Sequence, residues 1–567
     1  MRPFAARYHF YVRISSLSIE NFRCFQKLEL DFEQCQALIG ENGCGKTAVL
    51  AALRLVTSRS APANRLSERD FHVADAGDLK ITVRFSNPFI LKVPDGYGTK
   101  DIPCNEILLS AHRRDKPTPG TAFSGPIVAQ QVAIPIVYET GHAPDGVEGD
   151  LPAWIKKTDS GYQVSRKSGG KPMELGNRQL SLQNDLEGFP NVFYFDRDRE
   201  KEAKVGFNSL LGKIVKDLNW RFRKSWDQTA IASTWDAFYH TVLSGLEVPK
   251  TDRIIQPLRD RMREFFGREF RDLELSLLDI EQPFAKAFFA RRSSTNQIEQ
   301  GDLGSGVSIL LAYFLLDIVS RLSKEQFIIL IDEPELHLHP QLQQRLFADF
   351  QKSMSQVIYT THSDIFVSLA DWRAIKRFAP AGITPAKEGL ERPFGGKPIR
   401  EHLDEIKQWY RDRSVFFRED NQVFFSRLVL LVEGPAEKYG IPILASKLGK
   451  ELGQMTVLSC NGKNKIRDYQ LLCCAFDVPY FTVFDLDNQP VTATENATIA
   501  DCAGDGACAA FSSSFEELLG IPAGARHKTA TTFRRIDEID AADVPDEIAT
   551  HIDEISQWAY NADSDAL

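Results

Sequence analysis

The chain has 567 residues, 43% hydrophobic and 26% charged, so it can hold about three or four domains with sizeable cores and is not widely disordered. Its net charge of −9 and pI of about 5.8 argue against a uniformly basic nucleic-acid binder, although an acidic metal site would itself lower the total. The nine cysteines follow no zinc or disulfide spacing, the first residues lack the apolar core of a secretion signal, and no apolar run could span a bilayer, so we expect a cytoplasmic protein without membrane contact.

The N-terminal segment is expected to contain strands around a glycine-rich loop. Alternation of apolar and polar residues predicts strands at 11–19 and 28–32, and an apolar strand at 36–39 leads into the loop. Residues 47–56 have helical periodicity, which gives the order strand, loop, helix. Further strands are expected at 79–85, 106–110, 132–138 and 191–195, with a surface excursion rich in Gly, Pro and Lys at 143–176.

The loop at residues 40–47, GENGCGKT, matches a phosphate-binding pattern that requires a strand before it and a helix after it. Backbone N–H groups of such a loop point at phosphate oxygens, helped by the positive end of the helix dipole. We therefore expect ATP here, with Lys46 between the β- and γ-phosphates and Thr47 as a Mg²⁺ ligand. The residues assigned to the nucleotide are Gly40, Asn42, Gly43, Gly45, Lys46 and Thr47.

A second segment is expected to complete the ATPase site. An apolar strand at 327–331 ends at Asp332, whose carboxylate would hold the nucleotide's metal ion, and Glu333 would polarise the attacking water. Another strand, around 359–361, ends in His362, which would sense the γ-phosphate. Residues 327–333 could instead be a buried strand with a charged end, and His362 could be structural. The order of these motifs after the loop favours the ATPase interpretation.

The middle of the chain has the pattern of an insertion. Charged, helical residues run from 199 to 277, which we expect to form a solvated arm used for dimerisation; direct DNA contact by its basic residues is the alternative. Strand character returns at 284–291, a helix is expected at 306–322, and the Pro- and Gly-rich stretch 380–397 has the composition of a linker. The expected boundaries are 12–198 and 278–395 for the two parts of an ATPase, and 199–277 for the insertion.

Four acidic residues lie at or just after strand ends in a C-terminal α/β unit at 425–567. Glu433 ends one apolar strand, at the edge where open α/β sheets place ligands, and Glu437 follows at the start of a helix. Asp485 and Asp487 end another, and strand alternation would turn both to one face. Such a cluster needs a cation, and oxygen ligands suit Mg²⁺ or Mn²⁺, which can hydrolyse a phosphodiester. Each fragment is common by chance, but the strand context of both favours a metal site.

The order of the N-terminal motifs resembles the ATP-binding-cassette ATPases, in particular their SMC/RecF-like branch. IENFRCF at residues 19–25 is similar to the opening strand of that branch, and LGSG at 303–306 stands where the cassette has its LSGGQ-type segment. The resemblance implies that Ser305 and Gly306 contact the γ-phosphate held by a second subunit. The departure from LSGGQ puts this composite site in question, and the absence of a long coiled coil excludes an SMC rod.

The C-terminal motifs resemble the Toprim domain of topoisomerases, primases and OLD (overcoming lysogenisation defect) nucleases. NGKN at residues 461–464 is similar to the glycine-bearing turn between the two acidic motifs of that domain. The whole chain resembles the OLD nucleases, a group that includes the A subunit of the Gabija anti-phage system. This resemblance implies Glu516 as a further metal ligand and Lys528 as the residue that stabilises the pentavalent phosphate.

The fold expected is thus α/β: an SMC/RecF-like ATPase with a helical insertion, followed by a Toprim domain. Its expected function is a nucleotide-regulated, metal-dependent DNA endonuclease of anti-phage defence, a homo-oligomer (dimer or tetramer) assembled through the ATPase and the insertion. A UvrD-like helicase is the protein partner expected if its gene lies nearby. The alternative is a non-nucleolytic DNA-repair or clamp-type ATPase whose Toprim region only binds. A topoisomerase or primase is disfavoured because no zinc ribbon or breakage domain is evident.

Overall fold

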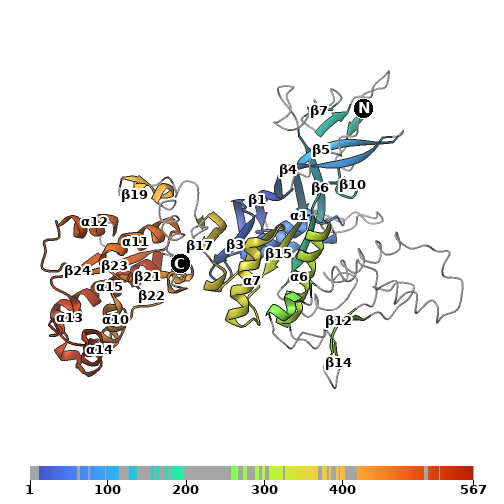
Figure 1. Cartoon of the computed structure of the whole chain (residues 1–567). Coiled ribbons are helices and arrows are strands. Elements are labelled where there is room, and N and C mark those ends of the chain that lie inside the picture. The colour runs from blue at the N-terminus through green and yellow to red at the C-terminus, as the bar shows by residue number, and fades with distance from the viewer. Residues whose placement is uncertain are drawn as a thin grey trace. The chain divides into compact units, whose positions relative to one another are not determined.

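The computed structural model forms two compact units, residues 1–36 with 45–361, and residues 37–44 with 362–567 (Figure 1). The residues that it describes are 12–59, 64–73, 77–95, 98–113, 127–136, 155–158, 161–164, 173–175, 180–196, 257–258, 260–265, 273–276, 288–292, 297–299, 305–323, 326–367, 373–379, 382–384, 391, 393–394, 396–402, 418–503, 508–522 and 524–565.

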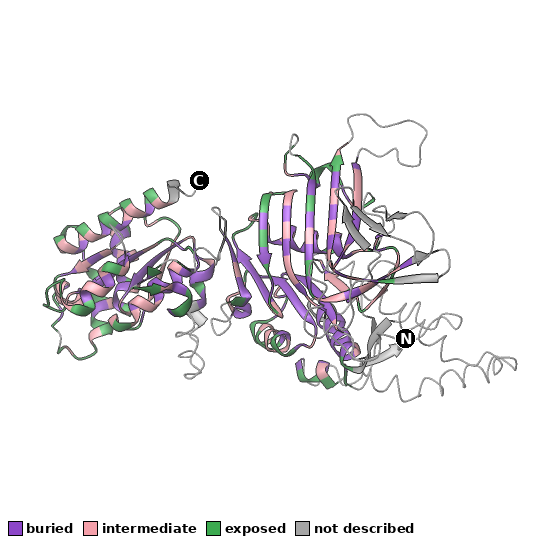
Figure 2. Ribbon diagram, turned by 90° about the horizontal axis from the view of Figure 1, so that it is seen from above, coloured by how far each residue is buried: buried purple, intermediate pink, exposed green. Residues whose placement is uncertain are grey.

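An antiparallel sheet in the first unit has the strand order β2-β1-β4-β5-β6, with β10 paired to β4. Its strands alternate buried and exposed residues, since only one face packs on a core (Figure 2). All the strands expected in this region are present, and β4 and β5 are longer than the sequence indicated. Their bounds are β1 Ile14–Phe22, β2 Phe25–Asp31, β4 Leu79–Asp95, β5 Gly98–Arg113, β6 Ile127–Pro135 and β10 Asp185–Glu187.

A second sheet, in the order β11-β15-β16-β3-β17-β18, carries the ATPase motifs. Its inner strands are continuous apolar runs, as parallel strands buried on both faces usually are. Helix α1 (Lys46–Thr57) follows β3, and α6 (Ser305–Ser323) and α7 (Pro340–Lys352) belong to the first unit. The strands are β3 Cys35–Gly40, β11 Asn191–Phe195, β15 Phe327–Asp332, β16 Gln356–Thr360, β17 Ile375–Ala379 and β18 Gly382–Thr384.

Most of the expected helical insertion, 199–277, lies outside the described residues, so its role in dimerisation or DNA contact stays a prediction. Within it, 257–258 and 260–265 are helical, as expected. Its last residues were expected to be helical too, but they form strand β12 (Leu273–Ser276), because the run LELS alternates and pairs antiparallel with β13 (Phe288–Arg292). Strand β14 (Gln297–Glu299) completes that three-stranded sheet.

Other short strands lie where the sequence suggested irregular chain. The described parts of the surface excursion form β7 (Ile155–Thr158), β8 (Gly161–Val164) and β9 (Met173–Leu175). In the expected linker, β19 (Pro393–Phe394) pairs with β20 (Lys397–Pro398). These pairings are too short to produce a readable alternation in the sequence.

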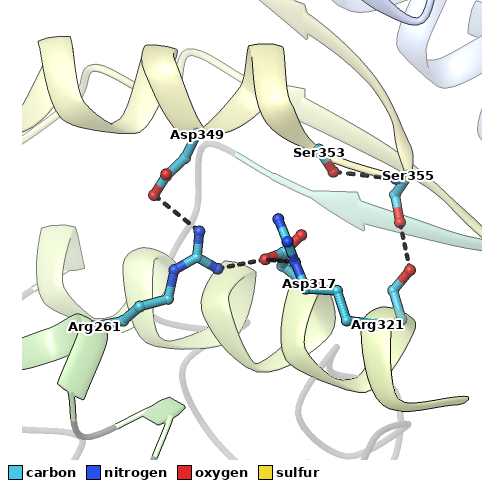
Figure 3. Close-up of polar contacts among 7 residues, drawn as sticks. Arg261, Asp317, Arg321, Asp349, Ser353 and Ser355 are labelled. Carbon is cyan, nitrogen blue, oxygen red and sulfur yellow. Dashed lines mark hydrogen bonds and ion pairs between the residues drawn. The ribbon is translucent and has the colours of Figure 1, made fainter. Parts of the chain in front are cut away.

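The helical segment at 260–265 is attached to α6 and α7 by buried charge (Figure 3). The Arg261 guanidinium donates to Asp317 of α6 and lies 3.2 Å from Asp349 of α7, while Arg321 donates to the same Asp317 oxygen at 2.9 Å. Only 1% of the Asp317 side chain is exposed, so Arg261 and Arg321 stabilise its charge in place of water. Arg261 also lies over the ring of Phe314, 4.9 Å from its centroid.

The C-terminal region has a parallel sheet in the order β22-β21-β23-β24, as expected for a Toprim α/β unit. Helices α10, α13, α14 and α15 pack on it through one apolar core that includes Leu430, Phe481 and Ile552 (Figure 1). Helices α11 and α12 also contact its strands. The bounds are β21 Leu428–Val432, α10 Pro435–Lys447, β22 Met455–Ser459, α11 Ile466–Ala475, β23 Tyr480–Asp485, α12 Thr494–Ala503, β24 Cys508–Phe511, α13 Phe515–Leu518, α14 Lys528–Glu538 and α15 Asp546–Asp565.

Within the described part of the chain, each helix is too short or too polar to cross a lipid bilayer.

Candidate nucleotide and metal sites

The glycine-rich loop has the backbone conformation that its glycines allow. Gly40, Gly43 and Gly45 have φ angles of 137°, 83° and 101°, a region that other residues rarely occupy. A Cβ atom on Gly45 would lie 2.3 Å from the Phe25 ring, and one on Gly40 would lie 2.4 Å from the Phe378 carbonyl oxygen. Both glycines therefore permit close packing behind the loop, whereas a Cβ on Gly43 would meet nothing within 4 Å.

Helix α1 begins at Lys46, within the loop, so the positive end of its dipole lies where the loop would hold a phosphate. The Lys46 side chain is buried, with 4% of the residue exposed. Thr47 donates to either oxygen of Asp332 at 3.2 Å. The expected pair of metal ligands, a hydroxyl from the loop and a carboxylate at the end of β15, is thus brought together.

Asp332 and Glu333 are fixed by the neighbouring strand. Thr360, the last residue of β16, donates its hydroxyl to Asp332 at 2.5 Å, and the Glu333 N–H donates to that hydroxyl at 3.0 Å. Glu333 has a φ of 51°, which is unusual for a residue with a side chain. The turn it makes directs the chain away from the sheet directly after the carboxylate of Asp332.

For three further residues expected at the nucleotide, the structure gives a position in the fold. His362 is exposed and follows β16 after one residue. Ser305 and Gly306 open helix α6, as the cassette resemblance implies for its signature segment. Contact of these residues with a γ-phosphate remains a prediction.

In the C-terminal α/β unit, which is the expected Toprim unit, three carboxylates from separate elements converge. Glu437 on the first turn of α10, Asp485 at the end of β23 and Glu516 in α13 each offer an oxygen within 4.8 Å of the other two. Parallel strands end at one edge of the sheet, which is why a residue ending β23 reaches the start of the helix that follows β21. These oxygens form a set of the kind that Mg²⁺ or Mn²⁺ prefers.

The polar atoms around this cluster are incompletely satisfied by the protein. Asp485 is 5% exposed, and its Oδ1 has no hydrogen-bond partner among the described residues, while its Oδ2 accepts from the Phe515 N–H at 3.4 Å. The Oε2 of Glu433 is also buried and without such a partner. Buried carboxylate oxygens without partners are costly, so the residues present fit a bound cation.

Burial and mutual repulsion disfavour the charged forms of these acids. Burial, and then the charges of Glu437 and Glu433, raise the pKa of Asp485 to about 8. Burial, assisted by the charge of Glu516, raises the pKa of Glu437 to about 7. Burial also raises the pKa of Glu433. A divalent cation would remove the cause of the repulsion.

Asp487 lies differently from what the sequence predicted. Strand β23 ends at Asp485, so alternation stops there, and Asp487 has a φ of 55° in the following turn. Its side chain is 56% exposed and pairs with the Lys463 ammonium at 2.8 Å. The expectation that alternation would turn Asp485 and Asp487 to one face is therefore wrong. Glu433 and Asp487 are both outside the three-carboxylate group.

Two lysines flank the carboxylates. Lys528, the first residue of α14, lies 3.2 Å from Glu516, so the two residues implied by the family resemblance meet at the cluster. Lys463 lies in the glycine-bearing turn at residues 461–464, and no role is predicted for it from the sequence. Its ammonium donates to the Asp485 carbonyl oxygen as well as to Asp487. A lysine in a turn between two acidic motifs was the only available signal.

A sequence family described as an AAA ATPase domain matches residues 13–118 and 181–367, which together make up just over half of the chain. The chain belongs to this ATPase family. A second family, described as the Toprim domain of overcoming-lysogenization-defect-like proteins, matches residues 424–487 of this ATPase. The expected order of an ATPase followed by an OLD-type Toprim domain is thereby confirmed.

The ATPase is also similar to individual proteins. It is 23% identical to the OLD nuclease of Thermus scotoductus (strain ATCC 700910 / SA-01), over 96% of this chain and 98% of that protein. Among solved structures, the Smc head domain of Pyrococcus furiosus bound to the C-terminal domain of ScpA is 14% identical, with a TM-score of 0.34 over 64% of this chain and 93% of that one. RecF bound to ATP is 12% identical, with a TM-score of 0.31 over 63% and 95% of the chains.

Proposed function

We propose that this protein is a DNA endonuclease whose Toprim carboxylates use Mg²⁺ or Mn²⁺, and whose ATPase domain regulates cleavage. The observation that carries the proposal is the convergence of Glu437, Asp485 and Glu516, with an unsatisfied buried oxygen on Asp485. The similarity to an OLD nuclease over nearly the full length of both chains supports the same assignment.

Each residue at the cluster has a distinct role in this proposal. Glu437, Asp485 and Glu516 hold the cation, which supplies Lewis-acid stabilisation to the charge that develops on the scissile phosphate. Glu433, at the end of β21, carries an unsatisfied buried oxygen beside this group and acts as the base that orients the attacking water. Lys528 offers a positive charge to the phosphate in its pentavalent state.

The nucleotide site is proposed to act as the control element. Lys46 and the loop glycines bind the phosphates, Thr47 and Asp332 hold the Mg²⁺, and Glu333 orients the water for hydrolysis. His362 senses the γ-phosphate, and Ser305 with Gly306 contacts the nucleotide of a second copy in a homo-oligomer. Either sign of regulation is compatible with this arrangement, because ATP occupancy can hold an open or a closed state.

The test is plasmid nicking by full-length protein with Mg²⁺ or Mn²⁺, compared with Asp485→Asn. We expect the variant to lose nicking by at least about 100-fold, because it removes a charge at the centre of the cation site, while ATP hydrolysis stays within about twofold of wild type. Lys46→Ala, in contrast to Asp485→Asn, should lose ATP hydrolysis. If the wild-type protein hydrolyses ATP but never nicks DNA, the non-nucleolytic clamp-type ATPase would be the better description.

We also propose a biological role in anti-phage defence, which rests on the resemblance to OLD and Gabija proteins. It predicts that cells carrying the gene resist phage infection and that Asp485→Asn abolishes that resistance. If a UvrD-like helicase is encoded nearby, co-purification with it would identify the pair. Protection that survives Asp485→Asn would contradict a nuclease-based defence.

A further inference from the structure

The second compact unit combines part of the nucleotide loop with the Toprim region. The end of β3 and the loop up to Cys44 belong to the same unit as residues 362–567. Strand β17 lies in this unit as well and pairs parallel with β3, so that Phe378 is opposite Gly40. A Cβ atom on Gly40 would lie 2.4 Å from the Phe378 carbonyl oxygen, so the backbone of the loop packs directly on β17. A displacement of the loop would therefore displace β17 too.

Arg377 of β17 reaches the end of the Toprim sheet at which β21 and β23 begin. Its guanidinium donates to the carbonyl oxygens of Phe476 at 3.0 Å, Asp477 at 3.1 Å and Ser426 at 3.1 Å. Phe476 and Asp477 lie between α11 and β23, and Ser426 lies just before β21. Only 5% of Arg377 is exposed, and its planar guanidinium can hold carbonyl groups of both segments at once, which a single ammonium could not do as rigidly.

A second arginine links the loop to the start of β21. Glu41, in the loop, lies 4.0 Å from the guanidinium of Arg427, the residue between Ser426 and β21. Burial lowers the pKa of Arg377, and the negative charges of Asp477 and Glu41 oppose that effect, which indicates that both carboxylates lie near its guanidinium. The loop and the start of β21 are thus connected through both arginines.

The strands held in this way carry acidic residues of the candidate cation site at their other ends. Glu433 directly follows β21, and Asp485 is the last residue of β23. The two strands pair in parallel, from Val429 opposite Tyr480 onwards. Strands that are hydrogen-bonded side by side in a packed core move together, and such rigid elements carry coupling between distant sites. A shift at the starts of β21 and β23 would therefore also move the carboxylates at their ends.

We propose that Arg377 couples the nucleotide loop to the cation site of the Toprim unit. Nucleotide binding shifts the loop together with β3 and β17, and Arg377 carries this shift to the starts of β21 and β23. Arg377 acts through other residues, so it is a positioning residue for regulation rather than a catalytic residue. The inference rests on the proposed nucleotide-regulated nuclease and adds the route by which ATP controls cleavage.

Two measurements on the full-length protein test the coupling, each with and without a non-hydrolysable ATP analogue at constant free Mn²⁺. The first is the rate of plasmid nicking, and the second is amide hydrogen exchange in residues 472–480, the segment that contains Phe476 and Asp477. The variants are Arg377→Met, Arg377→Lys and the control Lys376→Met. Lys376 precedes Arg377 in β17, and strand alternation turns its side chain to the opposite face. Thermal melting shows whether each variant is folded.

In wild type, the analogue should change both the nicking rate and the exchange in residues 472–480 by at least about fivefold, a usual size for coupling between two sites. In Arg377→Met, both responses should fall below about twofold, while nicking without nucleotide and ATP hydrolysis stay within about threefold of wild type. Arg377→Lys should also lose most of both responses, because an ammonium lacks the fork that reaches two segments. Lys376→Met should respond like wild type.

Two results would overturn the proposal directly. One is exchange in residues 472–480 that does not respond to the analogue in wild type, which needs no variant. The other is a full response in Arg377→Met. Equal losses in Lys376→Met would overturn it as well, because they would indicate a general effect of charge on β17. If Arg377→Met is unfolded at the assay temperature, Arg377→Lys decides, since it retains the buried positive charge.

Failure of this inference can be distinguished from failure of the proposed function. Nicking that requires Mn²⁺ and Asp485, with full responses in Arg377→Met, would leave the nuclease intact and remove the coupling. Exchange that responds to the analogue through Arg377, in a protein that never nicks DNA, would leave the coupling intact and remove the nuclease.

Discussion

The acids of the Toprim unit are buried in a way that favours protons in the absence of metal. Asp485 and Glu437 have pKa values raised to about 8 and about 7, in both cases mainly by burial. A group with a raised acidic pKa binds more protons in the folded state than in the unfolded state between its two pKa values. Stability from these groups is therefore complete at low pH and is lost as the pH rises through the folded pKa.

This predicts the pH dependence of the metal-free protein. In EDTA, the melting temperature should fall as the pH is raised from about 5 to about 9, and Asp485→Asn should make the fall shallower because the amide stays neutral. Added Mg²⁺ should restore the melting temperature of wild type at about pH 8, where it competes with fewer protons. Thermal melts over pH with both proteins provide the measurement. Parallel curves for the two would contradict the assignment of the shift to Asp485.

At the scale of elements, the contact between residues 260–265 and the helices α6 and α7 depends on Arg261. Asp317 is buried, and without Arg261 the one cation left to it among the described residues would be Arg321, whose side chain is 47% exposed. Removing one partner of a buried ion pair leaves uncompensated charge, which typically costs about 3 kcal/mol. The helices before and after β15, the strand that ends at Asp332, are thus joined to residues 260–265 by buried charge.

We expect Arg261→Met to lower the free energy of unfolding by about 2–4 kcal/mol, whereas Arg321→Met should cost less than about 1 kcal/mol because it is half exposed. Urea unfolding of the full-length variants, followed by tryptophan fluorescence, measures both. Equal effects of the two substitutions would show that burial of the charge is not what matters.

A second element-scale prediction concerns the packing that brings Glu516 to Glu437. Gly440 lies one turn after Glu437 on α10, and a Cβ atom there would lie 2.9 Å from the Phe515 ring and 2.8 Å from Ile536. Gly440→Ala should therefore push α13 outward and lower Mn²⁺ affinity, with a stability cost of about 1–3 kcal/mol despite the better helix propensity of alanine. Ser446→Ala, at an exposed position of the same helix, is the control. Unchanged Mn²⁺ binding in Gly440→Ala would contradict this packing role.

Much of this architecture follows from local sequence signals. Apolar strands ending in carboxylates predicted both Asp332 and Asp485, because parallel strands place their ends at one edge. Asp487 could not be placed, since alternation has no meaning after the strand ends. Glu516 and Lys528 needed the family resemblance, because a single acid or lysine in an ordinary helix has no pattern of its own. The ion pair of Lys463 depends on the lateral order of strands, which no local signal gives.

At the scale of the whole molecule, ATP is expected to change the assembly state. Ser305 and Gly306 open α6, and in the cassette interpretation they reach the nucleotide of another copy. Glu333→Gln should bind ATP without hydrolysing it, and so should accumulate the assembled state. Light scattering after size exclusion should give a higher mass with ATP than without, relative to a chain of 63.9 kDa. Lys46→Ala should show no response, and an ATP-independent mass in Glu333→Gln would contradict nucleotide-driven assembly.

At Glu333, the left-handed backbone lowers the stability of the protein at a position that we propose is needed for ATP turnover. Its φ of 51° costs a residue with a side chain about 1 kcal/mol, a penalty that glycine does not incur. We expect a library selected only for heat resistance to tolerate Glu333→Gly, although the proposed role of Glu333 in orienting water predicts that this variant loses ATP turnover. Screens that aim at a hardier enzyme should therefore assay hydrolysis alongside melting from the first round.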